Sequence, residues 1–308
     1  MKSVKLSILF FIVFAATVCL SVQAQNSYRN PIVPGMNPDP SICRVGDDFY
    51  LVTSSFEYFP GLPIYHSKDL VHWKLISYAL STASSNPLMG CNSSGGQYAP
   101  TIRYHDGLFY VIGTNYGGKG SPGISYVTAN DPAGPWSEPI GTGDWYVDPS
   151  LEFINDTCYY ISPDNKGSFL LGIMNTETGR FTEPLKLVAA GLGGSSPEGP
   201  HLYKIGDYYY IMSAEGGTGY QHREVIQRSK SPWGPYEPSP NNPVLSNMSV
   251  PKHPFQAIGH ADLVQLKDGS WRAVCLGIRP RNGKYQHLGR ETFFAPVTRD
   301  ENGWPKVG

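Results

Sequence analysis

The fold is decided by a stretch near the N-terminus, Asp39-Pro-Ser-Ile-Cys-Arg-Val-Gly-Asp-Asp-Phe-Tyr50, whose plan returns four more times. A short polar or proline-containing start leads into an apolar strand, a tight turn and an aromatic-rich strand. The later copies begin at Ala99, Asp148, Glu198 and His260. Self-similarity of this kind predicts a repeat architecture in which each copy forms one supersecondary unit.

Aromatic residues close the copies at similar intervals. They are Tyr50, Tyr110, Tyr160, Tyr210 and Trp271, spaced by 60, 50, 50 and 61 residues. Turn pairs such as Asp106-Gly107 and Asp268-Gly269 lie between apolar runs, which is a hairpin signal. A second half-repeat follows each hairpin and ends near Trp73, Trp136, Phe181, Tyr236 and Trp304.

Two hairpins per unit give about four strands, and radially repeated four-stranded sheets are the blades of a β-propeller. The sequence therefore predicts an all-β, five-bladed β-propeller that fills residues 26–308. A two-sheet sandwich is the alternative, but it does not account for five copies of one plan.

The composition agrees with this fold and excludes other classes. The 308 residues include 34 Gly and 27 Pro, only 16% are charged, and the net charge is -1. Few charges and many turn formers argue against a coiled coil or helix bundle. The absence of a long basic run argues against binding to nucleic acid.

The N-terminus has the pattern of a secretory signal peptide. Lys2 and Lys5 precede an apolar run from Leu6 to Leu20, and small residues precede a cleavage position after Ala24. We expect residues 1–24 to be removed, and the apolar run is short for a membrane span. The mature chain, 25–308, is then expected to be secreted or periplasmic, with no membrane association.

The repeat register brings distant charged residues together. The first strand of each propeller blade lines the central channel, so equivalent starts converge at one channel mouth. Asp39, Asp148, Glu198 and His260 occupy such starts, with one extra residue intervening in the fourth copy. An Asp beside Pro often only begins a turn, and His260 could be a core histidine. Three carboxylates at equivalent positions are harder to explain structurally, because like charges repel and raise a pKa.

Paired carboxylates with opposed pKa values are what glycoside hydrolysis requires. One carboxyl must remain protonated to donate a proton to the leaving oxygen, and the other must remain ionised. Carboxyls about 6.5 to 9.5 Å apart leave room for the water of an inverting reaction, whereas about 5 to 5.5 Å indicates retention.

The motifs around these residues resemble glycoside hydrolase family 43. The resemblance rests on Asn37-Pro-Asp-Pro-Ser-Ile, Val147-Asp-Pro-Ser-Leu, Pro197-Glu-Gly-Pro-His-Leu-Tyr and Ile258-Gly-His-Ala-Asp-Leu. Further stretches, including Thr53-Ser-Ser-Phe-Glu-Tyr-Phe-Pro, Ala214-Glu-Gly-Gly-Thr-Gly-Tyr-Gln-His and Gly289-Arg-Glu-Thr, are similar to its β-xylosidase and α-L-arabinofuranosidase branch. It covers residues 30–308.

The resemblance implies an inverting hydrolase and a role for each matching residue. Asp39 matches the general base, Glu198 the general acid, and Asp148 the carboxylate that orients the acid and raises its pKa. The substrate-binding residues that it implies are Phe56, Tyr98, Thr218, His260 and Arg290. No cofactor is required by this reading, although His260 matches a histidine that in some members helps to hold a central calcium ion, often through water.

The chain departs from the branch at two places. The second blade reads Gly95-Gly-Gln-Tyr-Ala-Pro100, where relatives usually place Trp at the position of Tyr98 as a sugar platform. Many relatives carry a C-terminal β-sandwich, whereas the sequence given ends at Gly308, so we expect either a single-domain variant or a truncated sequence.

The expected activity is exo-acting release of xylose or arabinose from xylan- or arabinoxylan-type chains of the plant cell wall. The alternatives are an endo-arabinanase-like hydrolase, a related propeller acting on fructosides and a non-catalytic carbohydrate-binding propeller. The retained carboxylates disfavour a binding module.

Overall fold

The computed structural model describes residues 28–283 and 285–308. The expected signal peptide, residues 1–24, lies outside these ranges. Residues 31–308 form one compact unit. Within the described residues, no helix is long and apolar enough to cross a membrane.

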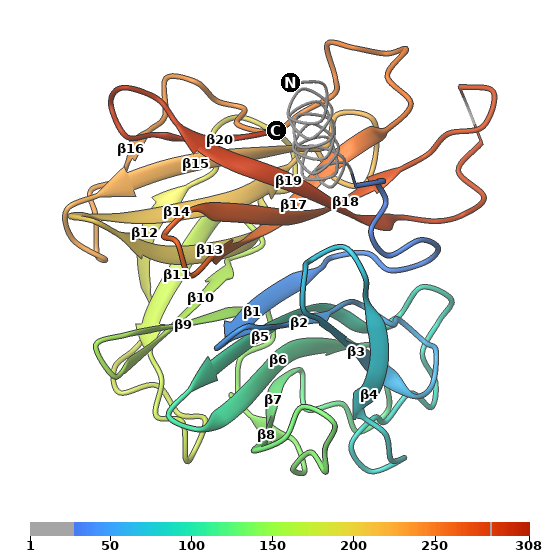
Figure 1. The fold of residues 1–308 in the computed structure, drawn as a ribbon. Coiled ribbons are helices and arrows are strands. Elements are labelled where there is room, and N and C mark those ends of the chain that lie inside the picture. Colours follow the sequence, from blue (N-terminus) through green and yellow to red (C-terminus); the bar gives the residue numbers. More distant parts are fainter. Residues whose placement is uncertain (1–27, 284) are drawn as a thin grey trace, which may run out of the picture. The chain divides into compact units, whose positions relative to one another are not determined.

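Twenty strands form five antiparallel sheets of four in the part of the chain that the structure describes (Figure 1). Blade 1 contains β1 (Ser41–Val45), β2 (Asp48–Val52), β3 (Gly61–Ser67) and β4 (Lys74–Leu80). Blade 2 contains β5 (Gly96–His105), β6 (Leu108–Tyr116), β7 (Ile124–Ala129) and β8 (Ile140–Gly141). Blade 3 contains β9 (Ser150–Ile154), β10 (Thr157–Pro163), β11 (Ser168–Ile173) and β12 (Lys186–Ala190). Blade 4 contains β13 (Glu198–Ile205), β14 (Tyr208–Glu215), β15 (Arg223–Ser229) and β16 (Glu237–Pro238). Blade 5 contains β17 (Gln256–Gln265), β18 (Trp271–Ile278), β19 (Glu291–Arg299) and β20 (Pro305–Val307).

The first strands of the blades form a closed ring. Strand β1 contacts β5 and β17, β9 contacts β5 and β13, and β13 contacts β17. Within every blade the strands follow one another in chain order as a meander. The prediction of a five-bladed all-β propeller is confirmed.

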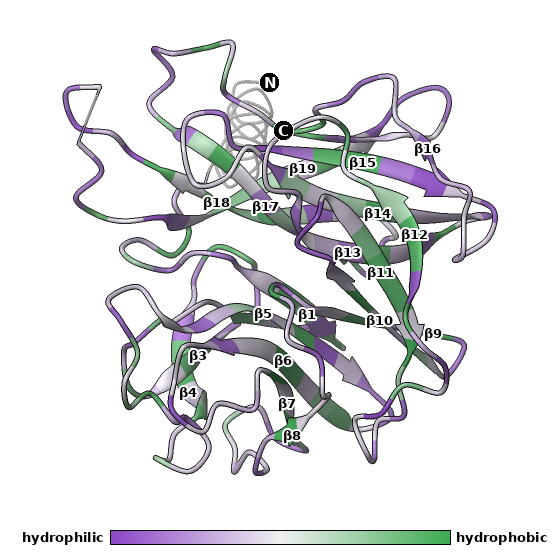
Figure 2. Cartoon of the chain, turned by 180° about the vertical axis from the view of Figure 1, so that it is seen from behind, coloured by the Kyte–Doolittle hydropathy of each residue, from purple (hydrophilic) through white to green (hydrophobic). Residues whose placement is uncertain are grey.

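The core consists of apolar clusters between neighbouring blades. The cluster between blades 1 and 2, for example, joins Val52 and Ile64 to Ile102 and Val111. Figure 2 shows apolar green segments along strands such as β6 and β11, whereas many connections are polar. Burial between blades explains the apolar strand pattern, since each sheet has a neighbour on both faces.

The recurring aromatics of the second half-repeat seal these interfaces. Each of the five joins a different interblade cluster, and they are Trp73, Trp136, Phe181, Tyr236 and Trp304. Each blade boundary therefore receives one large side chain from the outer half of a unit, which gives the repeat its physical basis.

Candidate active site

The innermost segment of every blade carries the same backbone kink, which lies just before the first strand in blades 1 and 3 and within it in blades 2, 4 and 5. Three residues before the first buried aliphatic of each unit, φ is positive, with values of 54° at Asp39, 31° at Ala99, 49° at Asp148, 54° at Gly199 and 49° at His260. For a residue other than glycine this left-handed region is sparsely populated and costs about 1–3 kcal/mol. In blades 2, 4 and 5 a register shift accompanies the kink, as bulges beside functional sites commonly do.

Glu198 lies one residue before the kink of blade 4, which falls on Gly199. A Cβ atom on Gly199 would lie 2.8 Å from Cε1 of His260, so glycine is required to leave room for that imidazole. The extra residue in the fourth copy therefore places Glu198 at the rim and admits the ring of His260 from blade 5.

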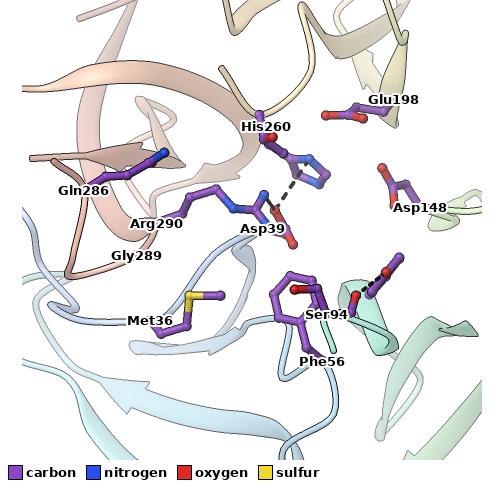
Figure 3. A pocket seen from close by; sticks show the side chains of 12 residues that line it. Met36, Asp39, Phe56, Ser94, Asp148, Glu198, His260, Gln286, Gly289 and Arg290 are labelled. Carbon is purple, nitrogen blue, oxygen red and sulfur yellow. Dashed lines mark hydrogen bonds and ion pairs between the residues drawn. The ribbon is translucent and has the colours of Figure 1, made fainter. Parts of the chain in front are cut away.

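One cavity of about 460 Å³ receives all eight predicted site residues (Figure 3). Its lining contains Asp39, Asp148, Glu198, Phe56, Tyr98, Thr218, His260 and Arg290. Figure 3 shows Asp39, Asp148, Glu198 and His260 facing a common space. Met36, Ser94, Gln286 and Gly289 also line this cavity. These four were missed because they lie outside the repeated segments, although Gly289 neighbours a predicted residue.

Asp39 is held as a carboxylate. Arg290 donates from Nη1 to Oδ1 over 2.8 Å, and the Ser54 hydroxyl donates to Oδ2 over 2.5 Å. Ser54 is itself oriented by the Ala99 N–H, which donates to its oxygen. Burial alone would raise the pKa of Asp39, but Arg290, His260 and the Ser54 hydrogen bond together outweigh it, so the pKa lies below the ordinary value.

Glu198 and Asp148 have the opposite electrostatic character. Burial, followed by repulsion from Asp39, raises the pKa of Glu198 to about 7. Burial, followed by repulsion from Glu198 and Asp39, raises the pKa of Asp148 well above its ordinary value. Both carboxyl groups therefore hold a proton more readily than ordinary ones do, and the pair keeps at least one proton near neutral pH. One cavity thus holds an ionised carboxylate, Asp39, together with two carboxyl groups that between them retain a proton, Asp148 and Glu198.

An aromatic wall bounds the cavity on the side of blades 1 and 2. The Arg290 guanidinium lies 5.6 Å from the Phe56 ring centroid, and the Phe56 and Tyr98 rings meet edge to face at 5.3 Å. The Phe56 backbone is bridged to Gln97, and the Tyr98 hydroxyl donates to the Ser94 carbonyl. Phe56 and Tyr98 therefore have fixed positions beside Asp39.

A tight loop between β14 and β15 carries Thr218 to the cavity. A Cβ on Gly216 would lie 2.1 Å from the Gln221 carbonyl, so the loop closes there only with glycine. The ring Nδ1 of His222 lies 2.5 Å from the Gly217 carbonyl, and the His222 N–H donates to Gly219. His222 was not predicted, because only its fold-dependent burial reveals this tethering role.

Deeper in the channel, one arginine connects all five blades. Arg103 of β5 donates to Asp262 of β17 and Glu152 of β9, and it reaches Ser41 of β1. Its Nη2 also lies 3.3 Å from Nδ1 of His201 in β13. Arg103 is buried and permanently charged, so it supplies positive charge at the channel centre.

The donor set around His260 does not fit a directly coordinated calcium ion. Both oxygens of Asp262 already accept hydrogen bonds, from donors that include Arg103, Ser41 and Tyr203. Nδ1 of His260 lies 4.0 Å from Asp39. Among the described residues, no group of three or more His, Cys, Asp or Glu side chains is arranged to hold a metal.

Two acidic residues that could have joined the cavity have structural partners instead. Glu215 accepts hydrogen bonds from Arg223 and from the backbone of Gly194. Glu291 is paired with Arg279 and also accepts the Gly35 N–H. Both carboxylates are fully buried and brace loops beside the site.

The family follows from comparison of this chain with known proteins. The model of glycosyl hydrolases family 43 matches residues 28–305. The chain belongs to glycosyl hydrolases family 43. This family 43 chain is 80% identical over 286 residues to the non-reducing end alpha-L-arabinofuranosidase BoGH43B of Bacteroides ovatus, covering 92% of the chain and 54% of that relative. It is 45% identical over 299 residues to a xylosidase/arabinosidase of Butyrivibrio fibrisolvens, covering 91% of the chain and 56% of the relative.

Solved structures of family 43 proteins share the fold. The Bacteroides ovatus xyloglucan PUL GH43B structure superimposes with a TM-score of 0.90 at 81% identity, over 91% of this chain and 56% of that one. The xylan beta-1,4-xylosidase of Bacillus halodurans gives a TM-score of 0.86 at 39% identity, over 91% and 56%. The chain thus spans little more than half the length of each of these four relatives.

Proposed function

We propose that this family 43 chain is the catalytic propeller of an exo-acting glycosidase that releases terminal α-L-arabinofuranosyl groups from plant cell-wall polysaccharides. The observation that carries the proposal is the convergence of Asp39, Asp148 and Glu198 in one cavity. Of these three described carboxyl groups, Arg290 is bound to that of Asp39 only. The lowered pKa of Asp39 and the pKa of Glu198, raised to about 7, agree with it. Arabinose is favoured over xylose by the 80% identity to an arabinofuranosidase.

The proposed reaction is a single displacement with inversion. Asp39 accepts a proton from water, and that water attacks the anomeric carbon. Glu198 donates its proton to the glycosidic oxygen as the bond to the leaving group breaks. Asp148 positions Glu198 and raises its pKa. Arg290 holds Asp39 ionised and contacts the sugar, while Phe56 and Tyr98 form the wall on which the sugar stacks.

We propose β-xylosidase activity as the second candidate. A xylosidase/arabinosidase and a xylan beta-1,4-xylosidase are among the relatives that cover about nine-tenths of this chain. The two activities require similar chemistry, because both sugars are pentoses attacked at the anomeric carbon.

Two further properties belong to the proposal. The occupied oxygens of Asp262 support hydrolysis without an added metal ion, and the signal pattern supports export from the cytoplasm.

The test is a panel of aryl glycosides: the α-L-arabinofuranoside, the β-D-xyloside and the β-D-galactoside. Preferential cleavage of the arabinofuranoside, with the first-formed product seen by NMR in the inverted configuration, supports the proposal. A retained anomer contradicts the single displacement, and cleavage of none of the three supports a carbohydrate-binding role instead. The Asp39→Asn variant should lose roughly 10²–10⁴-fold in kcat.

A further inference from the structure

A row of aromatic rings crosses the cavity side of blade 2. Tyr98 lies near the start of β5, and Tyr116 ends the antiparallel neighbour β6. Their rings are stacked at 5.5 Å with an interplanar angle of 18°. Tyr98 lines the cavity, whereas the side chain of Tyr116 lies farther out, and the residue is 58% exposed. The stacked pair therefore continues the cavity wall onto the molecular surface.

Trp145 extends this row to the next strand. A Cβ atom on Gly123, directly before β7, would lie 2.9 Å from Cε3 of Trp145. The indole therefore rests on the Gly123 backbone, and only glycine leaves room for it. The Gly123 carbonyl accepts the Asn115 N–H, so the segment on which Trp145 packs pairs with the end of β6, next to Tyr116.

The backbone beneath Trp145 is firmly held although its side chain is not covered. The Asp144 carboxylate accepts the Trp145 N–H at 2.7 Å and the Tyr160 hydroxyl at 2.5 Å. The Asp144 carbonyl accepts the Ile124 N–H. Trp145 is nevertheless 69% exposed. Trp145 therefore presents a large aromatic face to solvent from a fixed backbone.

The row extends the cavity wall outward from the Phe56–Tyr98 contact. It begins at the Phe56–Tyr98 wall and crosses from β5 to the segment before β7, which is two strand spacings or roughly 10 Å. Trp145 lies three residues before Asp148, on the loop that enters blade 3. The loop that carries Trp145 therefore leads directly to Asp148, which lines the cavity.

We propose that Tyr98, Tyr116 and Trp145 form an extended subsite that binds the main chain of the polysaccharide on the leaving-group side. The occupant is a β-1,4-linked pyranose chain, whose flat C–H faces stack on aromatic rings. This inference rests on the proposed function, because it places the polymer from which Glu198 releases the terminal sugar. Blade 2 then selects the polymer, while the cavity selects the terminal sugar.

The test measures binding separately from hydrolysis. In the Glu198→Gln background, calorimetry with xylohexaose and with cellohexaose should give measurable affinity for at least one, which identifies the main chain. Adding Trp145→Ala should weaken that affinity roughly tenfold, and Tyr116→Ala should weaken it to a smaller extent. The row is disproved if the Glu198→Gln protein binds neither oligosaccharide, or if Trp145→Ala leaves the affinity unchanged.

Trp233 provides a matched control. It follows the end of β15 in blade 4 that lies away from the cavity-lining Thr218 loop. Trp233→Ala should leave oligosaccharide binding unchanged. In otherwise unmodified protein, Trp145→Ala should raise KM more for arabinofuranosyl-bearing polymer than for the aryl arabinofuranoside. Equal changes on both substrates contradict the subsite. If no aryl glycoside is cleaved, the proposed function fails, while the calorimetry still decides whether the row binds sugar.

Discussion

Arg290 and Asp39, 251 positions apart in sequence, are joined by a 2.8 Å hydrogen bond from Nη1 to Oδ1 inside the cavity. Arg290 lowers the pKa of Asp39, and it also opposes the rise in the pKa of Glu198. One guanidinium thus affects both of the groups to which we assign proton transfer. Its position sets the pH range in which Asp39 is ionised while Glu198 is protonated.

Replacing Arg290 by Met should move both limbs of the pH profile of kcat/KM upward. Without the guanidinium the pKa of Asp39 rises. Asp39 is then protonated at a higher pH, so the acidic limb of the profile moves to higher pH. The pKa of Glu198 also rises, so the alkaline limb moves to higher pH. Arg290→Lys keeps the charge and should shift both limbs less. Unshifted limbs in a folded Arg290→Met protein would contradict this electrostatic role.

Glu198→Gln should abolish the alkaline limb, which is expected near pH 7. The amide does not titrate, so the remaining rate no longer falls as pH rises through this range. The loss should reach roughly 10²–10⁴-fold on natural glycosides and be much smaller on aryl glycosides with good leaving groups, which need little protonation. Equal losses on both substrates would count against Glu198 as the proton donor.

Asp148→Asn should move the alkaline limb to lower pH. Repulsion between Asp148 and Glu198 raises the pKa of the pair, so a neutral amide lets Glu198 ionise more readily. The pH profile of kcat measures this shift, with Asp164→Asn in the β10–β11 turn as the control, where the amide oxygen can still accept from Lys166 and Ser168. An alkaline limb that stays in place would show that burial and Asp39, without Asp148, set the pKa of Glu198.

Arg103→Met should destabilise the whole propeller. Removing the guanidinium leaves Asp262 fully buried without its charge partner, which typically costs about 3–5 kcal/mol. Thermal unfolding should show a Tm lower by several degrees. Lys267→Met removes an exposed pair that also joins blades 5 and 1, and should change stability by about 0.5 kcal/mol or less. Comparable Tm values for the two variants would refute the central role of Arg103.

Chelation by EDTA should leave kcat/KM within about twofold. The reason is the positive charge that Arg103 already supplies beside Asp262, whose oxygens are occupied by protein donors. Assays with and without added Ca²⁺ after chelation provide the measurement. A large loss of kcat/KM that added Ca²⁺ restores would show that activity requires a calcium ion despite the occupied oxygens of Asp262.

The repeat register predicts the fold because blade interfaces need similar apolar strands and sealing aromatics in every copy. It also brings Asp39, Asp148 and His260 together, since equivalent blade starts meet at the channel. The roles of the site residues remain predictions. The Arg103 network was beyond sequence reasoning, because its partners lie on four other blades and share no motif. Trp145 was missed for a different reason: exposure of an aromatic is visible only in the folded chain.

The repeated left-handed start of the innermost strands separates scaffold from chemistry. Because the kink is shared by Asp39, Ala99, Asp148, Gly199 and His260, the backbone accepts very different side chains at one geometry. Evolution can therefore exchange the groups around the channel mouth one at a time without rebuilding the blades. The propeller thus offers five equivalent backbone positions around the channel mouth, and the one occupied by Ala99 carries no reactive side chain.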